Sequence, residues 1–292
     1  MPDPLIEHTA APSLEDPVMI AAFRGWNDAG DSASFAAEHL GRIWSAERFA
    51  SIDPEEFFDF QAVRPRVELI DGHTRHITWP ANDFFAAHLE GTPPAILLVG
   101  TEPNTRWRTF SDLIVDVART YDVKMVITLG ALLADVPHSR PVPITGTAVD
   151  QDLIDKLGLQ RSRYEGPTGI VGVLHDSLGR AGISSASLWA AVPHYLAITP
   201  NPKAAFALLE KTGELLESSI DITSLRHAAD AYEERVTDMV ASDEDVQAYV
   251  RLLEERADER ARQEEIELPT GDALAAELER FLRERDESGP GE

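Results

Sequence analysis

Residues 17–33 read PVMIAAFRGWNDAGDSA and join an apolar run to a turn that contains Gly25 and Gly30. The run at 17–23 is short and continuous, which is typical of a strand buried inside a sheet. After the turn, apolar residues recur on one helical face: Ala33, Ala36, Leu40, Ile43 and Trp44. The stretch therefore predicts a strand, a tight turn and an amphipathic helix.

Three further apolar runs end in the same way, at glycine, proline or polar turns: 95–100 (AILLVG), 124–130 (KMVITLG) and 185–192 (SASLWAAV). Helical patterns lie between the runs, including Leu113, Ile114, Val117 and Ala118. Strands that alternate with helices indicate an α/β fold. We therefore expect a three-layer α/β/α arrangement with a mainly parallel or mixed sheet.

Two regions depart from this alternation. Asp71-Gly72, between RVELI and HTRHITW, is a two-residue turn signal, so we expect an antiparallel hairpin at about 66–79. After Pro200-Asn201-Pro202 only helical patterns follow, with a helix start at Ser242-Asp243. Their apolar stripes are Leu225, Ala229, Tyr232, Val236 and Met239, then Val246, Tyr249, Val250 and Leu253, and finally Leu274, Leu278 and Phe281.

These patterns divide the chain into segments. We expect a flexible N-terminus at 1–14, an α/β domain at 15–220, a helical C-terminal extension at 221–286 and a frayed tail at 287–292. The helical extension is expected to dock on the α/β domain or on another subunit.

The composition disfavours several classes of protein. The chain has 26 Lys and Arg against 51 Asp and Glu, a formal charge of −25, which disfavours binding to nucleic acid or to an anionic membrane. It has no cysteine, which excludes a thiol nucleophile, a thiolate metal site and a disulfide. No apolar run approaches the roughly 18–20 residues of a membrane-spanning helix, and the N-terminus lacks a secretory signal. We therefore expect a cytoplasmic protein.

The turn GWNDAGD has the position of a phosphate-binding loop, between a strand and a helix. The negative charges of Asp28 and Asp31 argue against that role, because these side chains would occupy the place of the anion. Neither GxGxxG nor GxxxxGKS is present. We expect instead that Asp31 or Ser32 caps the following helix, and that Gly25 and Gly30 allow the tight path.

Two later loops carry similar chemistry. Glu102 and Arg106 follow the strand at 95–100, where we weigh an ordinary ion pair between them against the floor of a polar pocket. In YEGPTG, residues 164–169, Glu165 adds a further acid. There Thr168 is expected to cap the next helix, beside the turn glycines Gly166 and Gly169.

The carboxyl ends of parallel strands meet at one edge of a sheet. The residues of these loops therefore predict a pocket or a partner-binding site at that edge. Its candidate members are Trp26, Asn27, Asp28, Asp31, Glu102, Arg106 and Glu165.

No complete catalytic or metal-binding set is recognisable. Ser139 follows His138, but a nucleophilic serine needs a separately oriented base, and no GxSxG elbow occurs. His73 and His76 have a spacing that points to opposite faces of a strand, which does not suit a shared metal. We therefore expect no catalytic residue, no metal and no cofactor.

Four stretches occur together in this chain: VMIAAFRGWNDAGD (18–31), LGALLADVPHSRP (129–141), YEGPTGI (164–170) and WAAVPHY (189–195). The combination resembles the PAC2 family, the proteasome assembly chaperone 2-like proteins, and is most similar to its actinobacterial members. The resemblance covers residues 15–215, and the pairing of GWNDAGD with YEGPTG carries most of its specificity.

The resemblance implies an α/β/α domain similar to the phosphorylase/hydrolase-like fold, a helical C-terminal part and a homo-oligomer, for which we prefer a trimer. Eukaryotic and archaeal relatives act on proteasome α-subunits, in some cases through a C-terminal hydrophobic-tyrosine-any motif. This chain departs from them, because residues 288–292 (SGPGE) contain neither tyrosine nor a hydrophobic residue. Docking by that route is not expected.

Two functions from different classes follow. The leading hypothesis is a non-enzymatic, protein-binding, chaperone-like protein that assists proteasome assembly. The alternative is a hydrolase or phosphorylase-like enzyme with a small-molecule pocket at the carboxyl ends of the strands. A weaker hypothesis is that the acidic helices serve as an oligomerisation arm.

Overall fold

The computed structural model describes residues 4–88, 93–148, 155 and 164–267, and every structural statement below refers to these residues. The expected stripe at Leu274, Leu278 and Phe281 and the frayed tail at 287–292 lie outside them. The chain divides into two compact units, residues 1–239 and 240–292. The domain boundary that we expect at residue 220 stays a prediction.

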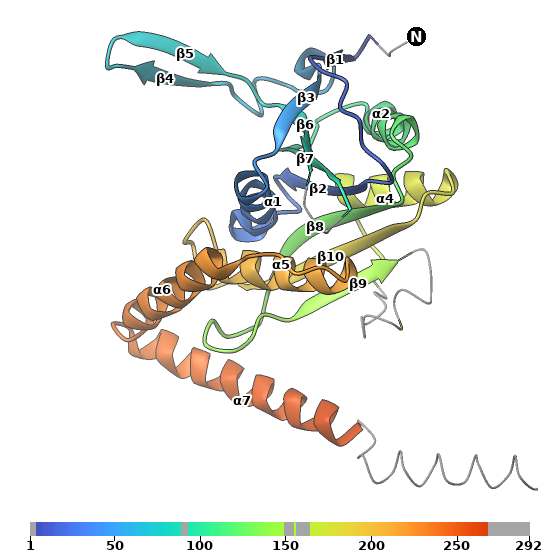
Figure 1. Ribbon diagram of the computed structural model, residues 1–292. Coiled ribbons are helices and arrows are strands. Elements are labelled where there is room, and N and C mark those ends of the chain that lie inside the picture. The colour runs from blue at the N-terminus through green and yellow to red at the C-terminus, as the bar shows by residue number, and fades with distance from the viewer. Residues whose placement is uncertain (1–3, 89–92, 149–154, 156–163, 268–292) are drawn as a thin grey trace, which may run out of the picture. The chain divides into compact units, whose positions relative to one another are not determined.

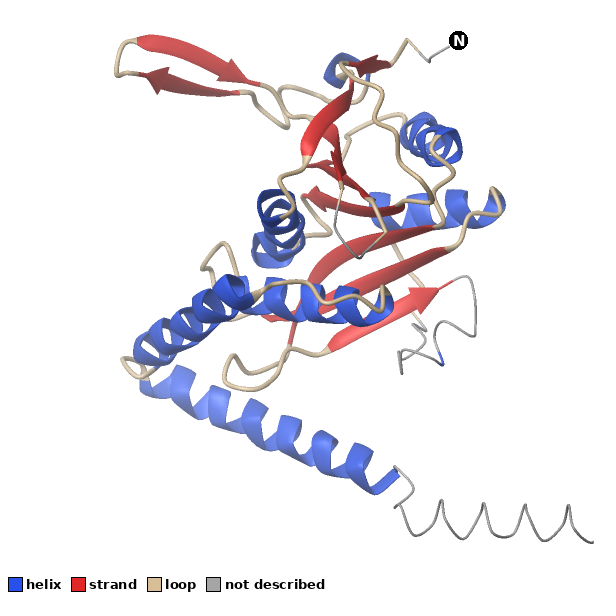
Figure 2. Ribbon diagram, in the orientation of Figure 1, coloured by secondary structure: helices blue, strands red, loops and turns tan. Residues whose placement is uncertain are grey.

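A mixed eight-stranded sheet forms the centre of the first unit, in the order β1-β3-β6-β7-β2-β8-β10-β9 (Figures 1 and 2). Four neighbouring strands run parallel: β7 (Ala95–Thr101), β2 (Val18–Arg24), β8 (Met125–Ala134) and β10 (Ser185–Pro193). These strands are the four apolar runs of the sequence, so their prediction is confirmed. β8 continues past its predicted end at residue 130.

Antiparallel strands flank this parallel group and make the sheet mixed. β1 (Ile6–His8), β3 (Glu47–Ile52) and β6 (Asn82–Ala87) extend the sheet beyond β7, and β9 (Ile144–Ala148) pairs with β10 at the other edge. The sequence did not indicate these strands, because they are short and lack a continuous apolar run.

Helices cover both faces of the sheet, as the α/β/α prediction requires (Figure 2). α1 (Ser32–Ile43) and α5 (Pro202–Leu215) lie on one face, and α2 (Trp107–Thr120) and α4 (Ile170–Arg180) lie on the other. Ala33 and Leu40 of α1 share one buried cluster with Leu208 of α5. Phe110 of α2 contacts Phe23 of β2 edge to face, with ring centroids 5.9 Å apart.

A separate hairpin projects from the first unit (Figure 1). It consists of β4 (Arg66–Ile70) and β5 (Thr74–Thr78), so the hairpin prediction is confirmed. Asp71 and Gly72 have φ angles of 54° and 74°, and the backbone N–H of His73 donates to the carbonyl of Ile70 at 3.1 Å. Because Ile70 pairs with Thr74, three residues rather than two separate the paired strand ends.

Two long helices complete the described chain, α6 (Thr223–Val240) and α7 (Glu244–Glu267). Leu225 of α6 belongs to the buried cluster on the α1–α5 face. The carboxylate of Asp243 accepts from the backbone N–H groups of Asp245 and Val246 at 3.0 and 3.1 Å, which confirms the predicted helix start. None of the described helices combines the length and apolar character that a membrane span needs.

Candidate functional site

The turn after β2 is hydrogen-bonded to β8 at the carboxyl edge of the sheet. The backbone N–H of Ala131 donates to the carbonyl of Asn27 at 2.8 Å, and Asp28 forms a parallel bridge with Ala131. Gly25 and Gly30 have φ angles of 128° and 64°, which favour glycine. Open α/β sheets bind ligands at this edge.

Asp28 caps helix α1 from a buried position. Its Oδ1 accepts from the backbone N–H of Ala33 at 2.6 Å, and its Oδ2 accepts from the Ser34 hydroxyl at 2.5 Å and from the Ser34 backbone N–H at 3.3 Å. Burial raises the pKa of Asp28 above 3.8, while the bonds from Ser34 and Ala33 oppose that shift. The carboxylate thus accepts hydrogen bonds from backbone N–H groups that have no partner within the first turn of α1.

The expectation that Asp31 or Ser32 caps α1 is therefore wrong, because Asp28 is the cap. Asp31 has a left-handed φ of 49° and makes no capping bond with its side chain. The hydroxyl of Ser32 donates to the carbonyl of Ala29 at 2.6 Å. The physical reason is the short 3-10 helix at Ala29–Asp31, which turns the chain so that Asp28 faces the first N–H groups of α1.

Glu102, at the end of β7, caps a helix on the other face of the sheet. Its Oε1 accepts from the backbone N–H of Ile170 at 2.8 Å and from Nδ2 of Asn27 at 2.7 Å. One carboxylate oxygen therefore joins the loops after β2 and β7 to the start of α4. These bonds hold the loops at fixed positions relative to one another.

Thr168 is not the cap of α4, which corrects a second expectation. The cap position is Gly169, and no side chain close to it in the chain makes a capping bond. A Cβ at Gly169 would lie 2.3 Å from Oδ1 of Asn27, so glycine is needed for this close approach. Thr168 packs over Gly172, where a Cβ would lie 2.1 Å from its Oγ1.

Arg106 does not pair with Glu102. It forms an ion pair with Glu56, and its guanidinium lies 5.6 Å from the centre of the Phe57 ring. This contact anchors the loop after β7 on the segment after β3. The ion pair weighed between Glu102 and Arg106 is therefore wrong.

Glu165 is exposed. Around it the Tyr164 hydroxyl donates to the carbonyl of Pro167 at 2.9 Å, and a Cβ at Gly166 would lie 2.6 Å from that hydroxyl. Glycine at 166 therefore lets the tyrosine fold back over its own loop.

A cavity of about 700 Å³, which we call the aromatic pocket, opens beside Trp26. Its lining consists of Gly25, Trp26, Ala29, Gly30, Ala131, Leu132, Leu133, Thr145, Gly146, Thr147, Tyr164, Pro167, Thr168, Val171, Gly172, His175, Ser187 and Trp189. No Asp, Glu, Lys or Arg occurs among these described lining residues. Burial lowers the pKa of His175 below 6.5, which favours the neutral form of its ring.

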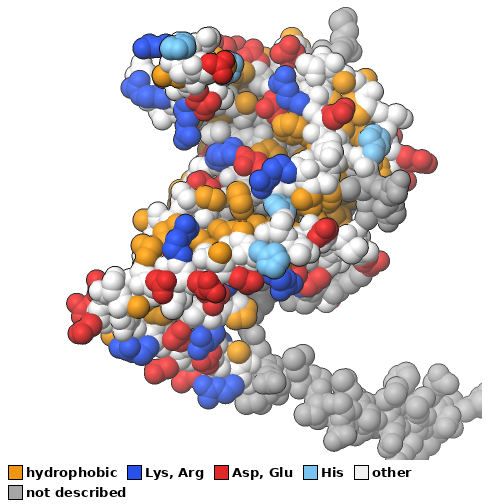
Figure 3. Space-filling model, turned by 60° about the vertical axis from the view of Figure 1, so that its left-hand side comes forward, with side chains coloured by type: hydrophobic (Ala, Val, Ile, Leu, Met, Phe, Trp, Pro, Cys, Tyr) orange, Lys and Arg blue, Asp and Glu red, His pale blue; other side chains and the backbone are white. Residues whose placement is uncertain are grey.

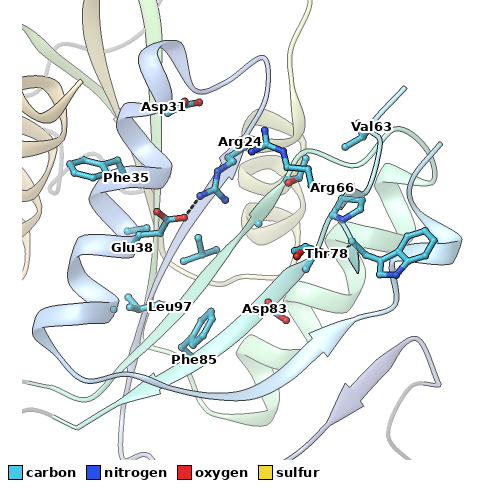
Figure 4. A pocket seen from close by; sticks show the side chains of 18 of the residues that line it. Arg24, Asp31, Phe35, Glu38, Val63, Arg66, Thr78, Asp83, Phe85 and Leu97 are labelled. Carbon is cyan, nitrogen blue, oxygen red and sulfur yellow. Dashed lines mark hydrogen bonds and ion pairs between the residues drawn. The ribbon is translucent and has the colours of Figure 1, made fainter. Parts of the chain in front are cut away.

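A second cavity, of about 1100 Å³, lies between the base of the hairpin and α1; we call it the hairpin hollow (Figure 4). Phe35, Phe85 and Leu97 contribute apolar surface. Arg24, at the end of β2, forms an ion pair with Glu38 of α1. The other labelled members are Asp31, Val63, Arg66, Thr78 and Asp83. In the space-filling view, hydrophobic side chains gather in a hollow below the projecting hairpin (Figure 3).

The structure therefore does not bring the predicted site residues together in one site. Trp26 lines the aromatic pocket and Asp31 lines the hairpin hollow. Asn27, Asp28 and Glu102 are joined to helix starts and loops. Arg106 pairs with Glu56, and Glu165 contributes to neither cavity.

Most of the aromatic pocket was not expected from the sequence. Leu132 and Leu133 line it because β8 continues past residue 130, and the apolar pair after Gly130 was a signal for that continuation. Thr145 and Thr147 belong to β9, which the sequence did not indicate. His175 reaches the pocket from α4 and had no recognisable motif.

Comparisons with known proteins agree on one family. The model of the PAC2 family matches residues 22–240. A PAC2 family protein from Streptomyces avermitilis is 45% identical with a TM-score of 0.74, over 80% of this chain and 100% of that chain. A proteasome-assembly chaperone homologue from Mycobacterium tuberculosis is 44% identical with a TM-score of 0.74, over 80% of this chain and 99% of that chain.

More distant likeness shows the fold alone. PbaA from Pyrococcus furiosus, an archaeal homologue of proteasome-assembly chaperone, is 19% identical with a TM-score of 0.58, over 86% of this chain and 99% of that chain. A search of the curated proteins found no match. Because the family model spans most of the chain and two solved relatives exceed 40% identity, the protein belongs to the PAC2 family.

Proposed function

We propose that this PAC2 protein is a non-enzymatic, protein-binding, chaperone-like protein that assists proteasome assembly in the cytoplasm. Its similarity to a proteasome-assembly chaperone homologue supports the choice of proteasome subunits as partners. We further propose that it acts as a homo-oligomer, with a trimer preferred on the family resemblance.

The observation that carries the binding role is the exposed apolar face of the hairpin. Val67, Leu69 and Ile77 are each more than half exposed. Val67 pairs with Ile77 across the strands, and alternation places Leu69 on the same face. A two-stranded hairpin is marginally stable on its own, and apolar patches on protein surfaces mark contact sites. This face is therefore suited to contact with another protein chain.

The alternative, an enzyme built on the acids of the strand-end loops, has less support. That hypothesis needs Asp28 and Glu102 to face a shared substrate. Their carboxylates instead accept hydrogen bonds from the first turns of α1 and α4. A carboxylate that holds a helix in this way is poorly placed for proton transfer to a ligand.

Isolation of the tagged protein from its own host tests the proposal. We expect free proteasome α-subunits or half-assembled particles to co-purify with it, relative to the tag alone. We also expect a deletion strain to accumulate unassembled α-subunits. No enrichment, together with normal proteasome assembly in the deletion strain, would remove the proteasome role.

A further inference from the structure

We propose that the aromatic pocket binds a small, uncharged molecule that is mainly aromatic. This inference goes beyond the proposed function and does not depend on it. It rests on the size, charge and side chains of the pocket.

The size and place of the cavity suit a small molecule. Ligand sites in proteins commonly measure about 300–1,000 Å³, and the aromatic pocket measures about 700 Å³. It opens at the carboxyl ends of β2 and β8, through Trp26 and Leu132, and extends to Trp189 in the middle of β10. Open α/β sheets place ligands at this edge. A cavity of this volume holds more than one side chain, which favours a free molecule over a single residue of a partner protein.

The uncharged side chains of the described lining restrict the ligand class. A quarter of the chain is charged (26%), yet no described residue of the pocket lining is Asp, Glu, Lys or Arg. The carboxylates of Asp28 and Glu102, in the loops after β2 and β7, accept hydrogen bonds from α1 and α4. A charged ligand would lose its hydration and find no counter-charge among the described lining residues, which is costly. Phosphates, carboxylates and ammonium groups are therefore disfavoured.

Aromatic surfaces line the pocket from separate elements. Trp26 comes from the turn after β2 and is 65% exposed, and Tyr164 comes from the loop before α4. Trp189 lies against Gly130, where an added Cβ would come within 2.7 Å of its ring. The indole N–H of Trp189 donates to the Ser187 hydroxyl at 2.9 Å, which fixes the orientation of the ring. The ring of Trp189, held in this way, offers a stacking surface to a planar ligand.

The described lining also offers polar groups without a formal charge. Thr145, Thr147 and Ser187 contribute hydroxyl groups, and burial lowers the pKa of His175, which favours its neutral ring. Nδ1 of His175 lies 3.1 Å from the Ser185 hydroxyl, a contact that orients the ring. A few neutral hydrogen-bonding groups in an apolar cavity select a ligand by position without supplying charge.

Titration with two naphthalene dyes tests the proposal on the full-length protein. We expect the uncharged dye prodan to bind with one site per protomer and increased fluorescence, and free indole to displace it. We expect the anionic dye anilinonaphthalene sulfonate to bind at least tenfold more weakly. Equal or tighter binding of the anionic dye, or no saturable binding of prodan, would overturn the proposal.

Two substitutions locate the binding. Trp26→Ala removes one exposed ring and should weaken the binding of prodan about threefold to tenfold. Leu132→Lys puts a charge at the pocket and should weaken the binding of prodan at least tenfold. Leu252→Lys, on α7, should leave the binding of prodan unchanged. Leu132 and Leu252 are 43% and 41% exposed, so the two lysines are matched, and circular dichroism checks that each variant is folded. Wild-type affinity in both pocket variants would contradict the proposed site.

A competition experiment distinguishes a free molecule from a partner side chain. A short uncharged peptide with one central tryptophan presents the same indole on a chain. Displacement of prodan by indole but not by the peptide is expected. Displacement by the peptide alone would assign the pocket to a protein partner and overturn the small-molecule proposal. Neither outcome bears on co-purification with proteasome subunits.

Discussion

Glu102 caps helix α4 at Ile170, a residue 68 positions later in the chain, through an Oε1 to backbone N distance of 2.8 Å. The same oxygen receives a hydrogen bond from Nδ2 of Asn27 at 2.7 Å. One side chain from the loop after β7 therefore fixes the start of α4 and the signature turn after β2. The loops that frame the aromatic pocket depend on this contact.

Replacement of Glu102 tests that dependence. Glu102→Ala leaves two donors without their acceptor and should lower the free energy of unfolding by about 1–3 kcal/mol, measured by urea denaturation. Glu102→Gln keeps an acceptor oxygen and should cost less. Glu15→Ala, an exposed acid in a loop, should stay within about 0.5 kcal/mol of the wild type. An equal effect of the alanine changes at 102 and 15 would contradict the capping role.

Asp28 should give the protein a specific pH dependence. Because its folded-state pKa is raised above 3.8, the folded protein retains a proton there that the unfolded chain has lost. The contribution of this group is thus fully present below pH 3.8 and falls as pH rises through the raised value. The difference in unfolding free energy between wild type and Asp28→Asn should decrease over that window, measured in urea at a series of pH values. A difference that is constant across pH would contradict this assignment.

Gly130 should not accept a side chain. A Cβ at this position would lie 2.7 Å from the ring of Trp189, which Ser187 holds in place. Gly130→Ala should therefore lower the unfolding free energy by about 1–3 kcal/mol and change the tryptophan fluorescence. Gly41→Ala is the control, because its Cβ would lie 3.6 Å from Leu97 and alanine favours a helix by up to about 1 kcal/mol. A neutral Gly130→Ala variant would show that the indole moves freely.

The hairpin should control self-association. Replacing Val67, Leu69 and Ile77 with threonine keeps strand-forming residues but removes the apolar face. We expect the mass measured by light scattering to fall toward that of the protomer. Threonine at Glu68 and His76, on the opposite face, is the matched control and should leave the mass unchanged. An unaltered mass in the triple variant would exclude this face as a contact between copies.

The sequence by itself determined the middle of the fold. β2, β7, β8 and β10 were predictable because a strand covered by helices on both faces needs a continuous apolar run. The hairpin and the start of α7 were predictable because their turn and cap residues act within a few positions. β3 and β6 were missed because short strands outside the parallel core form through pairing with neighbours rather than through a local pattern.

Only the tertiary structure decided the chemistry of the candidate site. The sequence indicated that the loops with Trp26, Asn27, Asp28 and Glu102 share one edge, since parallel strands end together. It did not indicate that Asp28 and Glu102 cap helices, nor that the described lining of the cavity beside Trp26 contains no Asp, Glu, Lys or Arg. The sequence pattern predicted a cap close to α4 in the chain, yet the acceptor, Glu102, lies in the loop after β7. Hydrogen-bond partners and cavity linings depend on which distant segments packing brings together, and that information is absent from local spacing.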